Sequence, residues 1–484
     1  MVSTSEISLS ARDAQKLAFA VDGITEASPR KTAELLTENH RKYHIYFNDK
    51  GFHNHILHHL VTLLGLGASP EEIQLAYDNN SSYQREPYPV HDRIRKDFSD
   101  PETFTSCLSN EEHYADFLDF FTAEIQNKGI PDVVNEYLFS RSPIAEDMLA
   151  RLFAGVIHPL LHLGFALETM SAPLVAEALA ETAVHSNFLH PTFTSIEAFA
   201  AHSTSPPKTL LQLIHEARAD PTFLTAAKSE SSPNLIDGIT NHAPDATTSL
   251  LSQYRVPNPT LRNLNAALAE QQSTLAHMVL SAQHPSLTKR PKLDFFLIHS
   301  LNAGLFFPVF LALPWLSEDN KRRLLEFKAR HDVLLYVGMY CPSLHPDVIK
   351  SYTPLPEHES WEGIFTSANR WEDDGHCAKV IRALAAGERL CAPFEGEEWC
   401  VTKKEEWKRM AAVAVESVGG EEGHWARFCG DEGAWEKVLS MEEFERVGRK
   451  VGRRGNAEAA VERIEERERK EQEGRRDSKG EAKL

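Results

Sequence analysis

The chain has 484 residues, of which 42% are hydrophobic and 25% charged, so it carries enough apolar material for a sizeable core. Its formal net charge of -19 argues against nucleic acid or an anionic membrane surface as a partner. No apolar run approaches the roughly 20 residues that a membrane span needs. The first residues lack a secretory signal and the six cysteines show no CxxC spacing, which is typical of reduced thiols, so we expect a cytoplasmic protein.

Helical periodicity dominates the chain from its first apolar segment. Residues 53–80, HNHILHHLVTLLGLGASPEEIQLAYDNN, repeat apolar residues at steps of three and four, pause near the glycines, and restart after a capping box. In that box Ser69 is a good N-cap, Pro70 suits the first helical position and Glu72 stands three residues after the cap. Further helices are expected over residues 140–168, 172–185, 209–219, 260–282, 293–313 and 377–387.

Strand patterns are scarce. Residues 330–341, RHDVLLYVGMYC, are the best strand candidate, although they also suit a helix. We therefore predict an all-α fold, a large helical array around a central buried site. Residues 1–440 are expected to form one catalytic domain, with a candidate seam between two helical lobes near 205–235. Residues 441–484 carry mixed charge and no aromatic residue after Phe444, which predicts a charged helix that frays into disorder.

Histidines recur in an apolar helical context in four segments. The i, i+4 spacing of His158 and His162 lets two imidazoles reach one ion from one helix. In the first segment, His55 can share a helix face with either His58 or His59. The candidates in chain order are His53, His55, His58 and His59, then His158 and His162, then His299, and finally His376 with Lys379 three residues later.

These residues also have ordinary explanations. A lone histidine on an apolar face, such as His299, is more often a hydrogen-bonded core residue than a ligand, and a helix lysine such as Lys379 usually faces solvent. Spacing alone therefore leaves a metal site and simple packing both open. The sequence contains no GxSxG elbow, no P-loop and no GxGxxG turn, so a conventional flavin or nicotinamide domain is not indicated.

Four long segments of the chain resemble the questin oxidase-like proteins of fungal secondary metabolism. The resemblance rests on FNDKGFHNHILHHLVTLLGLGASPEEIQLAYDNN, HPLLHLGFALE, FFLIHSLNAGLFFP and WEDDGHCAKVIRAL, and it covers most of the chain. It implies oxidative chemistry on aromatic polyketides, in which the central ring of an anthraquinone is opened with dioxygen in a net Baeyer–Villiger-type oxidation. NADPH is implied as a reductant. Because no nucleotide-binding pattern is visible, we expect another protein to use it to reduce the substrate.

The same resemblance implies a mononuclear non-haem iron centre held by four histidines and a carboxylated lysine. The implied ligands are one or more of His55, His58 and His59, then His158 or His162, then His299, His376 and Lys379, and the last three are the implied catalytic residues. Asp49, Asp373 and Asp374 are candidates to orient a ligand through its remaining N–H, and Glu168 is either an orienting or a structural carboxylate.

The implied ligand set is chemically coherent. Imidazole suits Fe(II), and one anionic oxygen ligand offsets part of the charge that four neutral rings leave uncompensated. Lys379 can supply that oxygen only after its neutral amine has reacted with carbon dioxide, which requires a site that lowers its pKa. The leading interpretation is therefore an iron-dependent oxygenase whose partners are an aromatic polyketide and dioxygen. The alternatives are a metal-dependent hydrolase and a non-catalytic, polyketide-binding helical protein.

Overall fold

Helices account for all the regular secondary structure of the part of the chain that can be described. The computed structural model describes residues 6–91, 98–229, 235–286, 288–419 and 425–446. Within these ranges β structure is limited to isolated bridges between single residues, such as Tyr46 with His53 and Asp294 with Ala426. The predicted all-α fold is confirmed, and the strand candidate at 330–341 is helical as far as Gly338.

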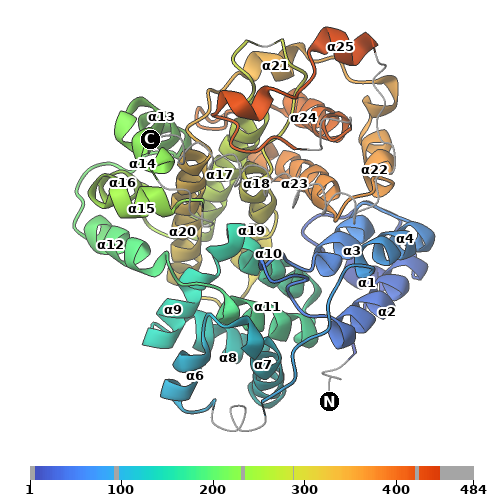
Figure 1. Ribbon diagram of the computed structural model, residues 1–484, viewed down its shortest axis with the longest axis vertical. Coiled ribbons are helices and arrows are strands. Elements are labelled where there is room, and N and C mark those ends of the chain that lie inside the picture. Colours follow the sequence, from blue (N-terminus) through green and yellow to red (C-terminus); the bar gives the residue numbers. More distant parts are fainter. Residues whose placement is uncertain (1–5, 92–97, 230–234, 287, 420–424, 447–484) are drawn as a thin grey trace, which may run out of the picture.

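The first part of the chain forms two groups of helices, drawn in blue and in blue-green in Figure 1. The capping box at Ser69 is present as predicted, with Pro70 in the first turn of its helix. The elements are α1 (Ala11–Ala14), α2 (Ala27–Lys42), α3 (Ile56–Gly65), α4 (Pro70–Ser81), α6 (Pro101–Cys107), α7 (Tyr114–Lys128), α8 (Ile130–Val134) and α9 (Pro143–Arg151).

The middle of the chain runs from the molecular centre to its edge and back. It comprises α10 (Ala154–Thr169), α11 (Ala172–Val184), α12 (His190–Ala201), α13 (Leu210–Ala219), α14 (Pro221–Lys228), α15 (Asp237–His242), α16 (Pro244–Leu251) and α17 (Leu261–Ser281). α11 packs between α7 and α10, which places both long faces of α11 in the interior. All but one of its residues are buried, in keeping with its nearly continuous apolar sequence.

The last part of the chain returns to the centre and then covers it. It comprises α18 (Leu297–Gly304), α19 (Phe307–Ala312), α20 (Glu318–Gly338), α21 (Pro346–Ser351), α22 (Trp361–Asn369), α23 (His376–Cys391), α24 (Lys404–Ser417) and α25 (Met441–Arg446). The remainder of the predicted charged tail lies outside the described residues, and the division into two lobes near 205–235 stays a prediction. All six cysteines are unpaired and buried.

Four helices from distant parts of the sequence meet at the centre of the molecule (Figure 1). α3 and α18 each pack against both α10 and α23. A buried ion pair joins two of the four, because Arg382 of α23 donates from both terminal nitrogens to the Glu168 carboxylate of α10, at 2.9 and 2.7 Å. Both side chains are completely buried. Arg382 also donates to the Phe19 carbonyl, and Glu168 accepts from the Ala18 amide, so the pair fixes the N-terminal segment as well.

The beginning of α10 is not a regular helix. Gly155, Val156 and Ile157 have φ values of 53°, 55° and 64°, in the left-handed region that β-branched residues rarely adopt. Gly155 also lies against His185, where a Cβ atom would come within 2.8 Å of the ring. The regular part of α10 therefore begins at His158, and Pro159 falls in its first turn, where no backbone donor is required.

No single helix of the described chain is long and apolar enough to cross a membrane. α9 and α10 satisfy the length and composition requirement only when they are taken together, and they are bent by 100° where they join.

Candidate functional site

Four of the predicted histidines converge where α3, α10, α18 and α23 meet. His55 is the N-cap residue of α3, His158 begins the regular part of α10, His299 lies in the first turn of α18, and His376 is the first residue of α23. The four residues are between 0% and 6% exposed. They form the four-histidine centre.

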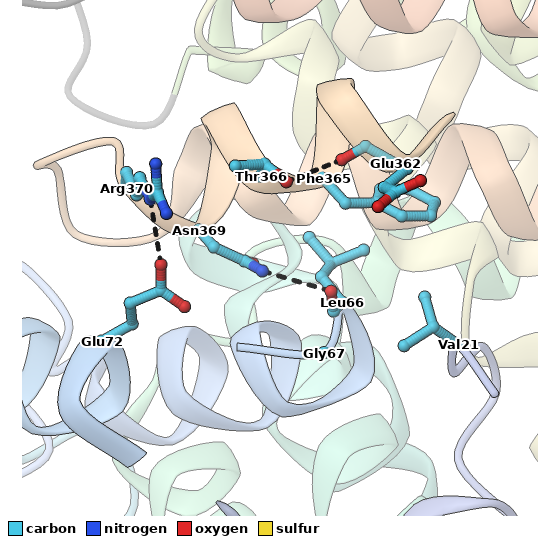
Figure 2. A pocket seen from close by; sticks show the side chains of 9 residues that line it. All are labelled: Val21, Leu66, Gly67, Glu72, Glu362, Phe365, Thr366, Asn369 and Arg370. Atoms are coloured by element: carbon cyan, nitrogen blue, oxygen red, sulfur yellow. Dashed lines mark hydrogen bonds and ion pairs between the residues drawn. The ribbon is translucent and has the colours of Figure 1, made fainter. Parts of the chain in front are cut away.

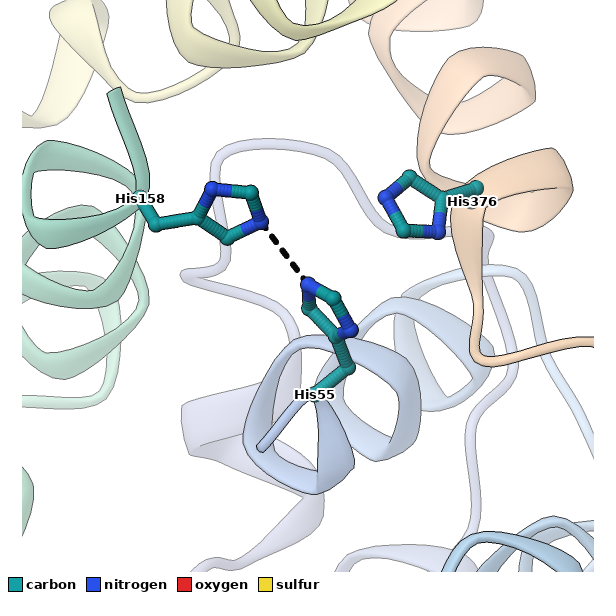
Figure 3. A group of neighbouring side chains, drawn as sticks. All are labelled: His55, His158 and His376. Atoms are coloured by element: carbon teal, nitrogen blue, oxygen red, sulfur yellow. Dashed lines mark hydrogen bonds between the residues drawn. The ribbon is translucent and has the colours of Figure 1, made fainter. Parts of the chain in front are cut away.

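The rings of the four-histidine centre face one another through their Nε2 atoms. The Nε2 atoms of His55 and His158 are 2.8 Å apart (Figure 3), and those of His376 and His299 are 3.2 Å apart. Ligand atoms of His55, His158 and His376 all lie within 4.8 Å of one another. The ring centroids of His158 and His299 are 4.9 Å apart, which brings the fourth ring to the same place.

Two of the four rings are oriented by backbone carbonyls. His158 Nδ1 lies 2.6 Å from the carbonyl oxygen of Gly155, in the left-handed turn, and His299 Nδ1 lies 2.8 Å from that of Phe295. Because a carbonyl oxygen can only accept, both Nδ1 atoms carry a proton and donate it. In a neutral ring the lone pair is then on Nε2, which faces the centre.

One carboxylate orients the other two rings. Asp374 lies in the segment before α23, with one oxygen hydrogen-bonded to His376 Nδ1 at 2.5 Å. Its other oxygen lies 2.8 Å from His55 Nδ1, a close contact without good hydrogen-bond geometry. Burial opposes ionisation of Asp374, but the adjacent His376 and His55 rings outweigh it and hold the pKa of this carboxyl well below its usual range. Asp374 therefore lies against the Nδ1 atoms of both rings, which leaves their Nε2 atoms facing the centre as those of His158 and His299 do.

Burial keeps the rings neutral, which is the form that binds a metal. It lowers the pKa of His55 to about 3 and the pKa values of His158 and His299 well below the usual range. Burial likewise lowers the pKa of His376, against the opposing charge of Asp374. Nitrogen lone pairs that face each other with no proton between them repel, and a shared cation relieves that repulsion, so the donor set fits a transition metal ion.

Lys379 stands one helical turn after His376 and is 1% exposed. Its Nζ has no hydrogen-bond partner among the described residues. Burial lowers the pKa of Lys379 to about 8, although the charges of Asp374 and Asp373 act in the opposite direction. The amine is thus closer to its neutral, reactive form than an exposed lysine is.

His58 lies beside the four-histidine centre. Its ring stacks on Phe165, with centroids 4.8 Å apart, and neither of its nitrogens has a partner in the described structure. Burial and the charge of Lys379 both lower its pKa well below the usual value. His58 is therefore a neutral ring beside the centre, with both nitrogens unpartnered among the described residues.

The structure does not bring His59 and His162 to the four-histidine centre. His59 accepts a hydrogen bond from the Asn80 side chain, at 3.3 Å, on the outer side of α3. His162 lies between two carboxylates of α11, with Nε2 3.1 Å from Glu177 and Nδ1 3.0 Å from Glu181. Burial opposes protonation of His162, but these carboxylates outweigh it and raise its pKa to about 9, so the ring is a cation.

The other carboxylates proposed to orient ligands have different roles. Asp373 accepts from the backbone amides of Gly375 and Cys377, at 2.6 and 2.9 Å, and so caps the beginning of α23. The Asp49 side chain is 94% exposed and pairs with Arg85 on the surface. Glu168 is structural, since it is consumed by the buried pair with Arg382.

Sequence reasoning missed a second group of ligand-type residues beside the centre. His53, Glu181 and His185 bring their ligand atoms within 4.8 Å of one another, and all three are buried. The sequence pattern that could have indicated this group is ETAVH, residues 181–185, which places Glu181 and His185 four residues apart on a predicted helix. Because the sequence of α11 is typical of an apolar core helix, Glu181 and His185 gave no sign of meeting a loop more than a hundred residues earlier.

Two cavities open between α22 and the α3–α4 connection. The larger is about 440 Å³, and the ion pair of Arg370 with Glu72, at 3.2 Å, crosses it (Figure 2). The smaller is about 130 Å³ and reaches His59 and Asp373. The smaller cavity therefore adjoins the segment that carries Asp374, and His59 is one of its lining residues.

Comparison with known proteins identifies the family of the chain. A family model described as questin oxidase-like matches residues 52–384. The oxidoreductase AflY of Aspergillus parasiticus is 36% identical over 473 residues, covering 90% of this chain and 94% of the relative. The Baeyer–Villiger monooxygenase dmxR6 of a Cryptosporiopsis species is 34% identical, covering 86% and 94%. The questin oxidase of Aspergillus fumigatus is 34% identical, covering 87% and 95%. The chain belongs to the questin oxidase-like family of oxidoreductases.

Proposed function

We propose that this chain is an oxygenase of fungal secondary metabolism that oxidatively opens a ring of an anthraquinone-type polyketide with dioxygen. The relatives support the reaction class, because they are named questin oxidase and Baeyer–Villiger oxidase. The observation that carries a metal-dependent mechanism is the four-histidine centre, in which four neutral rings turn their unprotonated Nε2 atoms toward one point.

The proposed metal is one ferrous ion, with His55, His158, His299 and His376 as its nitrogen ligands and the carbamate of Lys379 as its oxygen ligand. Iron would supply the one-electron chemistry that lets dioxygen react with a closed-shell aromatic ring. The buried Nζ of Lys379, which lacks a partner in the described part of the chain, supports its assignment, because a carbamate would give this atom a function that the bare amine lacks.

The protein's own residues hold the ligands in place. Asp374 keeps the Nδ1 protons of His55 and His376, and the carbonyls of Gly155 and Phe295 keep those of His158 and His299. No ring therefore has to reorient or lose a proton when the ion binds.

An aromatic face beside the centre suits a planar polyketide. The Phe295 ring lies 4.9 Å from His376 and 5.2 Å from His299, between centroids. Arg427 lies above this phenylalanine, with its guanidinium carbon 4.7 Å from the ring centroid, and Trp425 is 6.5 Å from His376. We assign the substrate to this side, where it can stack on aromatic rings and present phenolic oxygens to a cation.

The proposal is tested by metal analysis of the purified full-length chain after anaerobic loading with Fe(II). We expect Lys379→Ala and His299→Gln each to lower the iron content by about one ion per chain while far-UV circular dichroism is unchanged. Carbon-13 NMR of protein equilibrated with labelled bicarbonate should show a carbamate signal that disappears in Lys379→Ala. Asp49→Asn is the matched control, because its side chain is 94% exposed and orients no ligand.

Turnover separates the proposed function from its alternatives. Iron-loaded protein should consume dioxygen with a reduced anthraquinone and open its ring, with NADPH required only to reduce the quinone beforehand. Ring opening that continues without dioxygen would favour a metal-dependent hydrolase. Binding of the polyketide with no turnover, and iron content that is equal in all variants, would instead favour a non-catalytic binding protein.

A further inference from the structure

His53, Glu181 and His185 form a second cluster of metal-ligand residues, the α11 cluster, beside the four-histidine centre. His53 comes from the loop before α3, Glu181 from the last turn of α11, and His185 is the residue at which α11 ends. Their side chains are 9%, 1% and 10% exposed. They share no residue with the four-histidine centre.

The atoms of the α11 cluster are spaced for one ion. The Nε2 atoms of His53 and His185 are 2.8 Å apart, and Glu181 Oε1 lies 3.6 Å from the first and 3.8 Å from the second. Atoms that bind one zinc or ferrous ion at about 2.0–2.2 Å are themselves roughly 3–4 Å apart. Two imidazoles and one carboxylate also match the ligand types that such ions prefer.

Glu181 supplies an independent sign that something is bound. Neither of its carboxylate oxygens makes a hydrogen bond of good geometry within the described structure, although the side chain is 1% exposed. Oε2 has the cationic His162 ring 3.0 Å away, but Oε1 faces only the two neutral histidines. A buried carboxylate oxygen without a donor is costly, and a cation held by the two rings would satisfy it.

The neighbours of the α11 cluster hold it in a form ready to bind. The Tyr46 hydroxyl lies 2.7 Å from His185 Nδ1, so it can accept that ring's proton and leave Nε2 free. His162 contacts Glu181 through Nδ1, and its Nε2 contacts Glu177, which fixes the position of the ring. Burial lowers the pKa of His185 to about 3 and that of His53 well below its usual value, so both rings are neutral.

We propose that His53, Glu181 and His185 bind a second divalent transition metal ion, of the zinc or ferrous type, distinct from the ion of the four-histidine centre. The second ion joins the end of α11 to the loop that precedes α3. The His53 ring is stacked on that of His158, with centroids 3.9 Å apart and planes 2° from parallel. The second ion therefore fixes a surface against which one ligand of the first site rests. This assignment does not depend on the proposed oxygenase activity.

The test is a zinc titration of the chelator-stripped, full-length chain, followed by calorimetry and by metal analysis after dialysis. The exposed His91 with His113 and Asp116 forms another possible ligand group, so every protein carries His113→Gln. We expect two tight equivalents in this background, one in Glu181→Gln, one in His376→Gln, and none in the double variant. In Glu181→Gln, the zinc affinity of the α11 cluster should fall by about 100-fold or more.

His185→Gln provides a second variant of the α11 cluster should Glu181→Gln fail to fold, and circular dichroism checks both. A single equivalent in the background protein that is retained in Glu181→Gln would overturn the proposal. So would two equivalents retained in both variants of the α11 cluster, since His53, Glu181 and His185 would then be a hydrogen-bonded chain with no ion. Loss of both equivalents in Glu181→Gln would show that the two sites are not separate.

Discussion

The buried pair of Glu168 and Arg382 should be a principal determinant of stability, because it joins two helices that carry proposed ligands. Both side chains are completely buried, and the guanidinium contacts both carboxylate oxygens at 2.7 and 2.9 Å. Glu168→Gln keeps the shape and one acceptor but removes the charge. Arg382 is then a buried cation without a carboxylate, and its remaining acceptors are neutral: one amide oxygen and the Phe19 carbonyl. Loss of one member of a buried pair costs about 3–5 kcal/mol, so we expect a decrease of this size in the free energy of unfolding.

Urea denaturation followed by circular dichroism and tryptophan fluorescence measures this decrease. Glu38→Gln is the control, since its partner Lys42 is 57% exposed and surface pairs contribute only about 0–1 kcal/mol. The double variant Glu168→Leu with Arg382→Met should recover most of the loss, because apolar residues leave no charge unpaired. A loss below about 1 kcal/mol in Glu168→Gln, or no recovery in the double variant, would refute the reasoning.

Three further predictions concern the surroundings of the four-histidine centre. Asp374→Asn should weaken metal binding by about 10- to 100-fold in a competition titration, because an amide cannot accept both Nδ1 protons, and unchanged affinity would contradict its orienting role. Gly375→Ala should destabilise the protein by about 2–4 kcal/mol in urea, since φ is 92° and the new Cβ would lie 2.7 Å from His59. Gly396→Ala is its control, because nothing lies within 4 Å of that position. In chelator-treated protein the stabilisation from His162, whose pKa is raised to about 9, should be complete below pH 6.5 and lost between pH 6.5 and 9. This amounts to about 3 kcal/mol in thermal or urea unfolding, and an equal pH slope in His162→Gln would disprove the assignment.

Much of the fold could be predicted from local sequence. Three- and four-residue apolar steps and the capping box at Ser69 are local signals, and the structure confirms both. The segment at 330–341 was ambiguous because a short apolar run suits a buried strand and a buried helix equally. Its position in a 21-residue helix that begins at Glu318 removes the ambiguity. The left-handed turn at 155–157 carries no sequence signal beyond Gly155, since two β-branched residues argue against it.

The candidate site was predicted only in part, for a physical reason. Spacing shows that His158 and His162 share a helix face, but it cannot show what the opposite helix brings to that face. Glu177 and Glu181 of α11 pair with His162, whereas His158, at the beginning of the helix, turns toward the other rings. The ambiguity among the histidines at 55, 58 and 59 has the same origin, since only tertiary packing distinguishes the inner and outer sides of α3.

The position of each converging histidine in the first turn of its helix has an electrostatic consequence. The peptide dipoles of a helix leave a partial positive charge at its N-terminus, and here four such ends surround one buried point. This field discourages protonation of the rings and favours negative charge at the same point. The proposed carbamate of Lys379 and the ionised form of a phenolic substrate would both be stabilised by this field, and their negative charge would offset its repulsion of a metal cation.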